Sequence, residues 1–186
     1  MTVQPAGAEV SYTITYLEMN ARPSFDYPRL PIGSSAALLK ATNPPAWYFL
    51  SLYDAVGRDY AWEDMHTLPV EDVKEQLDRS DIFTLIDHGW PHGFFMLEDM
   101  PDNRVDLAYF GLVPEAVGSG LGGWLLKTAI LTAWERPDTA LVTVNTCTLD
   151  HPRALALYQK NCLVHVRRED KSRILTRDRD LSRIPG

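Results

Sequence analysis

The stretch from Tyr109 to Leu126 (YFGLVPEAVGSGLGGWLL) constrains the fold of this chain more than any other. An apolar, strand-like segment passes through a proline into four glycines within Gly118–Gly123, and a helix-like segment follows at once. Glycines let the backbone approach a ligand without interference from Cβ atoms. Free N–H groups at the start of a helix, backed by the helix dipole, bind anions. The stretch therefore predicts a phosphate-binding turn in an α/β fold.

Two well-known phosphate-binding motifs fit this stretch poorly. A P-loop is excluded because no Lys-Ser/Thr pair follows the glycines. Gly118, Gly120 and Gly123 do satisfy the dinucleotide pattern G-x-G-x-x-G, which also needs an acid at the end of the next strand to hold a ribose. Thr143 and Val144 stand there instead, and too little chain follows for the second half of a doubly wound sheet. We therefore do not expect a nicotinamide enzyme.

The chain before the glycines predicts a sheet with two helices. Alternating or continuous apolar runs indicate four strands: Val10–Met19, Ile82–Ile86, Gly93–Leu97 and Val105–Leu112. The last three would form a meander of adjacent antiparallel strands. Prolines and glycines bracket a helix over Ala46–Val56, and acidic residues follow Pro69 at the start of a helix over Val70–Leu77. We also expect a short helix over Ala36–Ala41.

The chain after the glycines predicts a buried helix over Gly122–Glu135 and a buried, parallel-type strand over Ala140–Cys147. A last helix is expected over Pro152–Asn161, with Asp150 or His151 as its N-cap. A closing hairpin, Leu163–Arg168 with Ser172–Thr176, would complete the sheet. We expect residues 1–186 to form one domain, with residues 177–186 as a loose, charged tail.

Two motifs relate the chain to a known family. Residues Val117–Gly122 fit the acyl-CoA motif Gln/Arg-x-x-Gly-x-Gly/Ala, except that Val117 replaces Gln/Arg. Ala154 and Tyr158 fit the later pattern Asn-x-x-Ala-x-x-x-Tyr-x-x-x-Gly-Phe. In that pattern His151 replaces Asn, and Cys162-Leu163 replaces Gly-Phe. On these residues the chain resembles the GCN5-related N-acetyltransferase (GNAT) superfamily.

The resemblance implies a mixed α/β (α+β) fold in which a centrally splayed sheet, flanked by helices, holds acetyl-CoA as co-substrate. The residues it assigns to this cofactor are Leu112, Val113, Val117, Gly118, Ser119, Gly120, Leu121, Gly122, Gly123 and His151. The implied reaction is direct attack of an amine on the thioester. Such a reaction needs a neutral amine, a stabilised oxyanion and a proton for the departing thiolate.

Several residues are candidates for this chemistry. Tyr158 is our candidate general acid, although its place on the helix is also compatible with packing alone. Glu98, Asp106, His88 and His151 are candidate bases, and a chain of water molecules could replace them all.

The acceptor would meet aromatic and polar side chains. The candidates for substrate binding are Tyr53, Trp62, Glu63, Tyr109 and Thr146. Tyr53 to Asp64 carries more polar aromatic and acidic groups than a core needs, which favours an organic amine.

Net charge, the lengths of the apolar runs and the cysteine spacing limit which partners and cofactors we expect. A net charge of −7 argues against nucleic acid and mildly favours a cationic small molecule. No apolar run is long enough for a membrane span, so we expect a cytoplasmic protein without a membrane partner. Cys147 and Cys162 have no metal-ligand spacing, and we expect no metal. A homodimer is left open.

We therefore expect an N-acetyltransferase acting on a small primary amine. The alternatives are acetylation of a protein or peptide, and a non-catalytic acyl-CoA-binding module.

Overall fold

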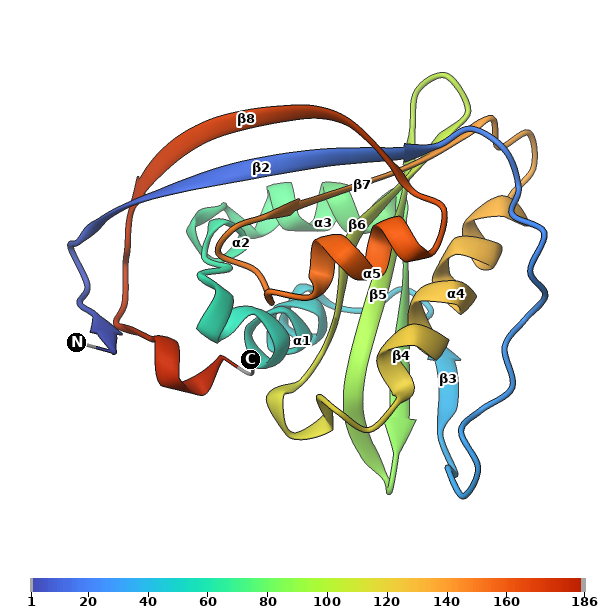
Figure 1. Cartoon of the computed structure of the whole chain (residues 1–186), viewed down its shortest axis with the longest axis horizontal. Coiled ribbons are helices and arrows are strands. Elements are labelled where there is room, and N and C mark those ends of the chain that lie inside the picture. The colour runs from blue at the N-terminus through green and yellow to red at the C-terminus, as the bar shows by residue number, and fades with distance from the viewer. Residues whose placement is uncertain (1, 185–186) are drawn as a thin grey trace.

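The computed structural model describes residues 2–184, and its centre is a seven-stranded mixed sheet (Figure 1). Five of the six neighbouring strand pairs are antiparallel, and only β6 and β7 run parallel to each other. From edge to edge the strands are β3 (Ala37–Lys40), β4 (Ser80–Asp87), β5 (Trp90–Met100), β6 (Arg104–Leu112), β7 (Leu141–Cys147), β2 (Glu9–Met19) and β8 (Val164–Ile174).

Helices cover both faces of this sheet. One face carries α1 (Ala46–Gly57) and α3 (Val70–Asp78), and the other carries α4 (Leu121–Trp134) and α5 (Ala154–Lys160). The shorter elements are η1 (Arg58–Tyr60), α2 (Asp64–Thr67), η2 (Pro114–Ala116) and η3 (Leu181–Arg183), with the strand pair β1 (Val3–Gln4) and β9 (Arg179–Asp180). Within residues 2–184 no helix has both the length and the apolar character needed to cross a membrane.

Strand β5 shows why the middle of the sheet is apolar on both sides. Phe94 and Met96 point to the cluster that contains α1 and α3, whereas Phe95 and Leu97 point to the cluster that contains α4. All four side chains are fully buried. A strand covered on both faces carries a continuous apolar run, as in the segment GFFML, and not a strict alternation.

The sheet splays at its centre, as the family resemblance implied. Strands β6 and β7 pair with each other only from Arg104–Asp106 to Leu141–Thr143, and beyond this short ladder each strand pairs only with its other neighbour, β5 or β2. Opposite β5, Leu107 pairs with Leu97 and Tyr109 pairs with Met96, so Ala108 is an extra, bulged residue. A bulge bends its strand and increases the local twist. The divergence leaves backbone groups on the facing edges of β6 and β7 free for a ligand.

Most of the predicted elements are confirmed, and two are wrong. Residues 36–41 are not a helix: Ala37–Lys40 pairs with β4 as the edge strand β3. Residues 163–176 are not a hairpin either, because β8 runs unbroken to Ile174 and pairs along β2 (Figure 1). Strand β8 carries the charged run RREDKSR, because an edge strand with exposed side chains tolerates charge, which also discourages edge-to-edge aggregation.

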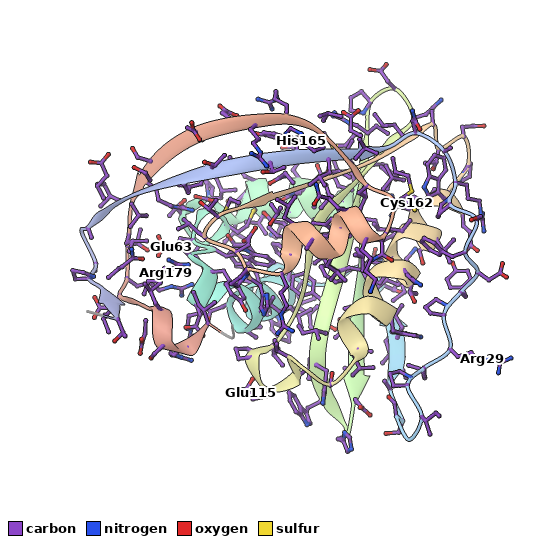
Figure 2. The ribbon with its side chains drawn as sticks, in the orientation of Figure 1. Arg29, Glu63, Glu115, Cys162, His165 and Arg179 are labelled. Atoms are coloured by element: carbon purple, nitrogen blue, oxygen red, sulfur yellow. The ribbon has the colours of Figure 1, made fainter. Side chains whose placement is uncertain are left out.

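The C-terminal segment is held in place, contrary to the loose tail expected from residue 177. Arg179 is 7% exposed and donates to the Asp59 carbonyl oxygen (3.1 Å), the Leu149 carbonyl oxygen (2.8 Å) and Gln4 Oε1 (3.0 Å). In Figure 2 its side chain points inward from the C-terminal segment. The many charged residues of this segment predicted that it would be exposed to solvent. The Arg179 guanidinium is buried nevertheless, because its three hydrogen-bond acceptors compensate for the loss of water. Residues 185–186 of the predicted tail lie outside the described residues.

Candidate active site

A cavity of about 420 Å³ opens where β6 and β7 diverge. One wall is the splayed part of β6 with the glycine loop, and the other is the end of β7 with the start of α5. Its lining residues include Leu107–Leu112, Val117, Gly118, Gly120, Gly122, Gly123, Asn145, Thr146, Asp150, His151, Arg153, Ala154, Leu157 and Tyr158, together with Val56, Tyr60 and Trp62. The structure thus brings both predicted motifs to one cavity.

The glycine loop offers unpaired backbone donors to this cavity. Gly118 (φ +90°) and Gly120 (φ +82°) have left-handed conformations that favour glycine, and Gly120 is the N-cap residue of α4. Gly122 and Gly123 lie in the first turn of the helix, where N–H groups have no intrahelical acceptor. A Cβ atom on Gly123 would meet no other atom within 4 Å. The loop therefore has the open backbone geometry that an anion-binding cradle needs.

Other residues assigned to the cofactor by the resemblance offer fewer groups to the cavity than expected. The Val117 N–H donates to the Pro114 carbonyl oxygen (3.2 Å), so this N–H is not free to bind a ligand, although Val117 lines the cavity. The Leu121 and Val113 side chains are buried in the apolar core, and the Ser119 hydroxyl accepts from the Leu121 N–H (3.4 Å). None of these three side chains lines the cavity, whereas Leu112 does.

Tyr158 lines the cavity from α5, with its ring 6.0 Å from that of Phe110. The residue is only 5% exposed. Burial raises the pKa of the Tyr158 phenol far above its usual value, and the charges of Asp150 and Asp106 raise it further. Within the described chain no hydrogen bond engages its hydroxyl. Tyr158 is therefore a phenol that keeps its proton and has that proton free to donate.

His151, at the position of the family's asparagine, also lines the cavity. Its Nδ1 accepts from the Arg153 N–H (3.1 Å), which places the proton of the neutral ring on Nε2. Nε2 is buried and has no hydrogen-bond partner among residues 2–184. Burial, followed by the charge of Arg153, lowers the pKa of the ring. His151 is thus a neutral donor of one hydrogen bond.

Asp150 lines the cavity, although it was not among the predicted site residues. It was predicted to cap the last helix, but that helix begins at Ala154 without a side-chain cap. Its carboxylate instead accepts from Trp62 Nε1 (3.0 Å), Thr146 Oγ1 (2.7 Å) and the Cys147 N–H (2.8 Å). Among the described residues that line the cavity, Asp150 is the sole carboxylate. Its position after a buried strand was the one sequence signal that could have indicated this.

Aromatic rings form the wall beside Asp150. Trp62 and Tyr109 line the cavity, as predicted, and Tyr60 joins them. Tyr53 does not line it: this residue is 2% exposed and packs behind the wall, with its ring 5.4 Å from Trp62 and 5.2 Å from Tyr109. Burial raises the pKa of Tyr53 to about 12. The prediction for Tyr53 as a contact residue is therefore replaced by a supporting role.

Three predicted acids lie outside the cavity lining. Glu63 accepts from the Thr176 N–H (3.0 Å), and Glu98 accepts from Arg79 Nε (2.6 Å) and Gln76 Nε2 (2.8 Å). Asp106 accepts from Thr143 across the short β6–β7 ladder, and burial raises the pKa of its carboxyl. These acids satisfy structural donors. The remaining candidate base, His88, lies in the β4–β5 turn, also outside the lining.

The fold is shared with several solved structures at low sequence identity. A GCN5-related N-acetyltransferase from Kribbella flavida has a TM-score of 0.59 at 16% identity, covering 86% of this chain and 56% of that one. A GCN5-related N-acetyltransferase from Sphaerobacter thermophilus has a TM-score of 0.58 at 15% identity, covering 93% and 53%. A functionally unknown conserved protein from Staphylococcus epidermidis has a TM-score of 0.60 at 14% identity, covering 92% and 63%. The chain thus spans between about half and two thirds of the length of these proteins.

Sequence comparison identifies the family. Among curated proteins no sequence matches the chain. The family model described as "Acetyltransferase (GNAT) family" matches residues 49–162, which include the glycine loop and the helix of Tyr158. The chain therefore belongs to the GNAT family of acetyltransferases, whose acyl donor is acetyl-CoA.

Proposed function

We propose that this protein is an N-acetyltransferase that moves an acetyl group from acetyl-CoA to a primary amine of a small molecule within a ternary complex. The proposal takes residues 1–186 as one catalytic domain. One observation carries it: a single cavity joins the N–H-rich glycine loop to a wall of aromatic rings around the Asp150 carboxylate. The loop suits the phosphates of an acyl-CoA, and the wall suits an organic cation.

The donor side of the cavity fits acetyl-CoA. Gly118, Gly120 and Gly123 present backbone at which no side chain intervenes, and the start of α4 supplies free N–H groups. Leu112 lies on the part of β6 that does not pair with β7, and it adds backbone groups that the extended pantetheine arm of the cofactor can bind. When bound, acetyl-CoA supplies a thioester whose sulfur leaves as a thiolate.

Tyr158 is the proton donor of the proposed mechanism. A phenol already holds its proton at neutral pH at its usual pKa of about 10, and burial raises the pKa of Tyr158 further. Its hydroxyl has no competing acceptor among the described residues and can give the proton to the leaving sulfur. The neutral His151 ring offers its Nε2–H as a second hydrogen bond in the same cavity.

Asp150 and the aromatic wall hold the acceptor. The carboxylate attracts an ammonium group, and Trp62, Tyr60 and Tyr109 provide ring surface for its carbon skeleton. The amine loses its proton through water to solvent before it attacks. The net charge of −7 adds a field that favours cationic acceptors over anionic ones.

A thiol-release assay with acetyl-CoA tests this function. The acceptors would be small primary amines, polyamines, and peptides with a free N-terminus or lysine. We expect turnover on small amines, and Asp150→Asn should raise KM for the amine at least about tenfold. Asp26→Asn, which removes the same charge at an exposed site, is the control and should change nothing.

Two outcomes would replace the proposal. Turnover on peptides but not on small amines would make the protein a peptide acetyltransferase. Tight CoA binding without turnover on any acceptor would indicate an acyl-CoA-binding module.

A further inference from the structure

The turn between β4 and β5 gathers three metal-ligating side chains, those of Asp87, His88 and His92. Their candidate ligand atoms all lie within 4.8 Å of one another. Asp87 and His92 are buried, at 6% and 7% exposure, whereas His88 faces solvent. None of the three lines the acyl-CoA cavity. The cluster is therefore separate from the chemistry described above.

His92 is held by a backbone carbonyl in the tautomer that leaves Nε2 without a proton. Its Nδ1 lies 3.2 Å from the Trp90 carbonyl oxygen, and a carbonyl can only accept, so Nδ1 carries the proton. This leaves the lone pair of Nε2 available for coordination. The Trp90 ring packs on the imidazole with centroids 3.9 Å apart and fixes its orientation. Metal-binding histidines commonly donate their second N–H to such a carbonyl.

Asp87 is oriented by donors that occupy only one of its oxygens. Oδ1 accepts from Ser35 Oγ (2.8 Å) and from the His88 N–H (3.1 Å). Oδ2 has no such donor among the described residues and lies 3.4 Å from His88 Nδ1. The carboxylate thus keeps one oxygen free on the side of the His88 imidazole.

The backbone of the turn places His88 beside the other two residues. His88 (φ 50°) and Gly89 (φ 85°) both have positive φ, as a two-residue hairpin turn of type I′ requires. His88 is an uncommon residue at such a position, where Asn or Gly is preferred. The turn brings the His88 and His92 rings to 5.9 Å in a stacked arrangement.

We propose that Asp87, His88 and His92 bind one divalent transition-metal ion, and that Zn²⁺ is the ion this set suits. Two imidazoles and one carboxylate are ligands that Zn²⁺ accepts, with bonds of about 2.0–2.2 Å that place tetrahedral ligand atoms about 3.3 Å apart. The exposed His88 side chain can close the remaining gap by rotation. Water fills the fourth position, and Ser35 orients one of the three ligands through its hydrogen bond to Asp87. The expectation of no metal considered only the cysteine spacing.

The test uses the full-length protein, freed of metal by dialysis against a chelator and titrated with ZnCl₂ by calorimetry. We expect one Zn²⁺ per chain, with a rise in Tm on binding. His88→Ala changes an exposed side chain, so the fold should survive, and it should weaken Zn²⁺ binding at least tenfold. Ser35→Ala, which removes only the hydrogen bond to Asp87, should weaken binding by about tenfold or more.

His165→Ala is the matched control. His165, labelled on β8 in Figure 2, is also an exposed histidine, and its loss should leave the affinity unchanged. The absence of stoichiometric binding to the unaltered protein would overturn the proposal. So would equal affinity in the unaltered protein and His88→Ala, because the ion would then be bound elsewhere.

Discussion

Tyr158 combines a buried ring with a hydroxyl that no described protein atom engages. The ring belongs to the core that includes Phe110 and the α4 side chains, so its position is set by packing. The hydroxyl adds no hydrogen bond to that packing. The packing of Tyr158 and the chemistry we propose for it therefore rest on different atoms of one residue, and a substitution that removes only the oxygen can separate them.

Tyr158→Phe should lower kcat about 10²- to 10⁴-fold, the usual contribution of a general acid. The affinity for CoA should change by less than about threefold, and Tm should stay level or rise, because no hydrogen bond is lost. Steady-state kinetics, CoA titration and thermal unfolding would measure these effects. Tyr48→Phe, which removes a hydrogen bond with Thr84 Oγ1 (2.7 Å), is the control and should lower Tm without altering kcat. An unchanged kcat for Tyr158→Phe would remove Tyr158 from the mechanism.

His151 should make stability depend on pH. Its pKa is lowered in the folded protein, mainly by burial, so below about pH 6.5 the unfolded chain binds a proton that the folded chain does not. Stability is therefore complete above pH 6.5 and falls as the pH drops through that value. His151→Asn, which can still accept from the Arg153 N–H, should show a smaller loss of Tm between pH 7 and pH 5. Identical Tm profiles for the two proteins would contradict this.

At the scale of elements, the glycine loop and α4 act as one unit. The left-handed conformations of Gly118 and Gly120 turn the chain so that the first N–H groups of α4 face the cavity. The geometry of the cradle therefore depends on backbone conformation more than on side-chain identity. This explains how the motif can carry Val117 at its first position and still form the loop.

Gly120→Ala tests this dependence. A Cβ atom at φ +82° strains the backbone by about 1–2 kcal/mol and alters the start of α4, so CoA affinity should fall about tenfold. Gly7→Ala is the matched control, since Gly7 has φ +83°, and its Cβ atom would meet no other atom within 4 Å. Both variants should lose similar stability in denaturant unfolding, but only Gly120→Ala should bind CoA more weakly. Equal CoA affinity in the two variants would show that the loop is not the cradle.

The sequence predicted the elements that are determined by residues within their own segment. It did not predict the elements that form by pairing with a segment far away along the chain. The helix over 46–56 and the β4–β5 hairpin follow from prolines, glycines and apolar spacing within the segments themselves. The edge strands β3 and β8 have weak signals of their own and form because β4 and β2 offer unpaired edges.

The same distinction holds for the site. The cradle and Tyr158 were predicted from motifs, whereas the role of Asp150 depends on Trp62, which is 88 residues away. No spacing along the chain reveals such a contact. Glu63 was misplaced for the same reason, because its partner Thr176 is 113 residues away.

At the scale of the whole molecule, the two ends of the chain close against each other and support the cavity. Strand β1 pairs with β9, and Arg179 bonds to the carbonyl oxygens of Asp59 and Leu149. Each of these carbonyls is next to a residue of the cavity wall, Tyr60 and Asp150 respectively. The C-terminal segment thus supports the cavity wall to which we assign the acceptor. The homodimer left open by the sequence stays a prediction.

Arg179→Ala should therefore lower both stability and acceptor binding. Losing the guanidinium leaves buried carbonyls without donors, which costs about 1–3 kcal/mol in the free energy of unfolding. KM for the amine should rise, while CoA affinity stays within about threefold. Arg183→Ala, on the same segment but half-exposed, is the control and should change stability by less than about 1 kcal/mol. If both variants behave alike in amine kinetics, Arg179 does not brace the wall.

Because Trp62 is hydrogen-bonded to Asp150, its fluorescence should report on ligands that bind beside this carboxylate. Trp62 is the one tryptophan of the chain's five that lines the cavity in residues 2–184. A charged ligand beside its indole changes the local field and the light that the indole emits. An acceptor that enters the cavity should therefore change the intrinsic fluorescence of the protein. This signal should be absent in Trp62→Phe, so occupancy could be followed without labels or turnover.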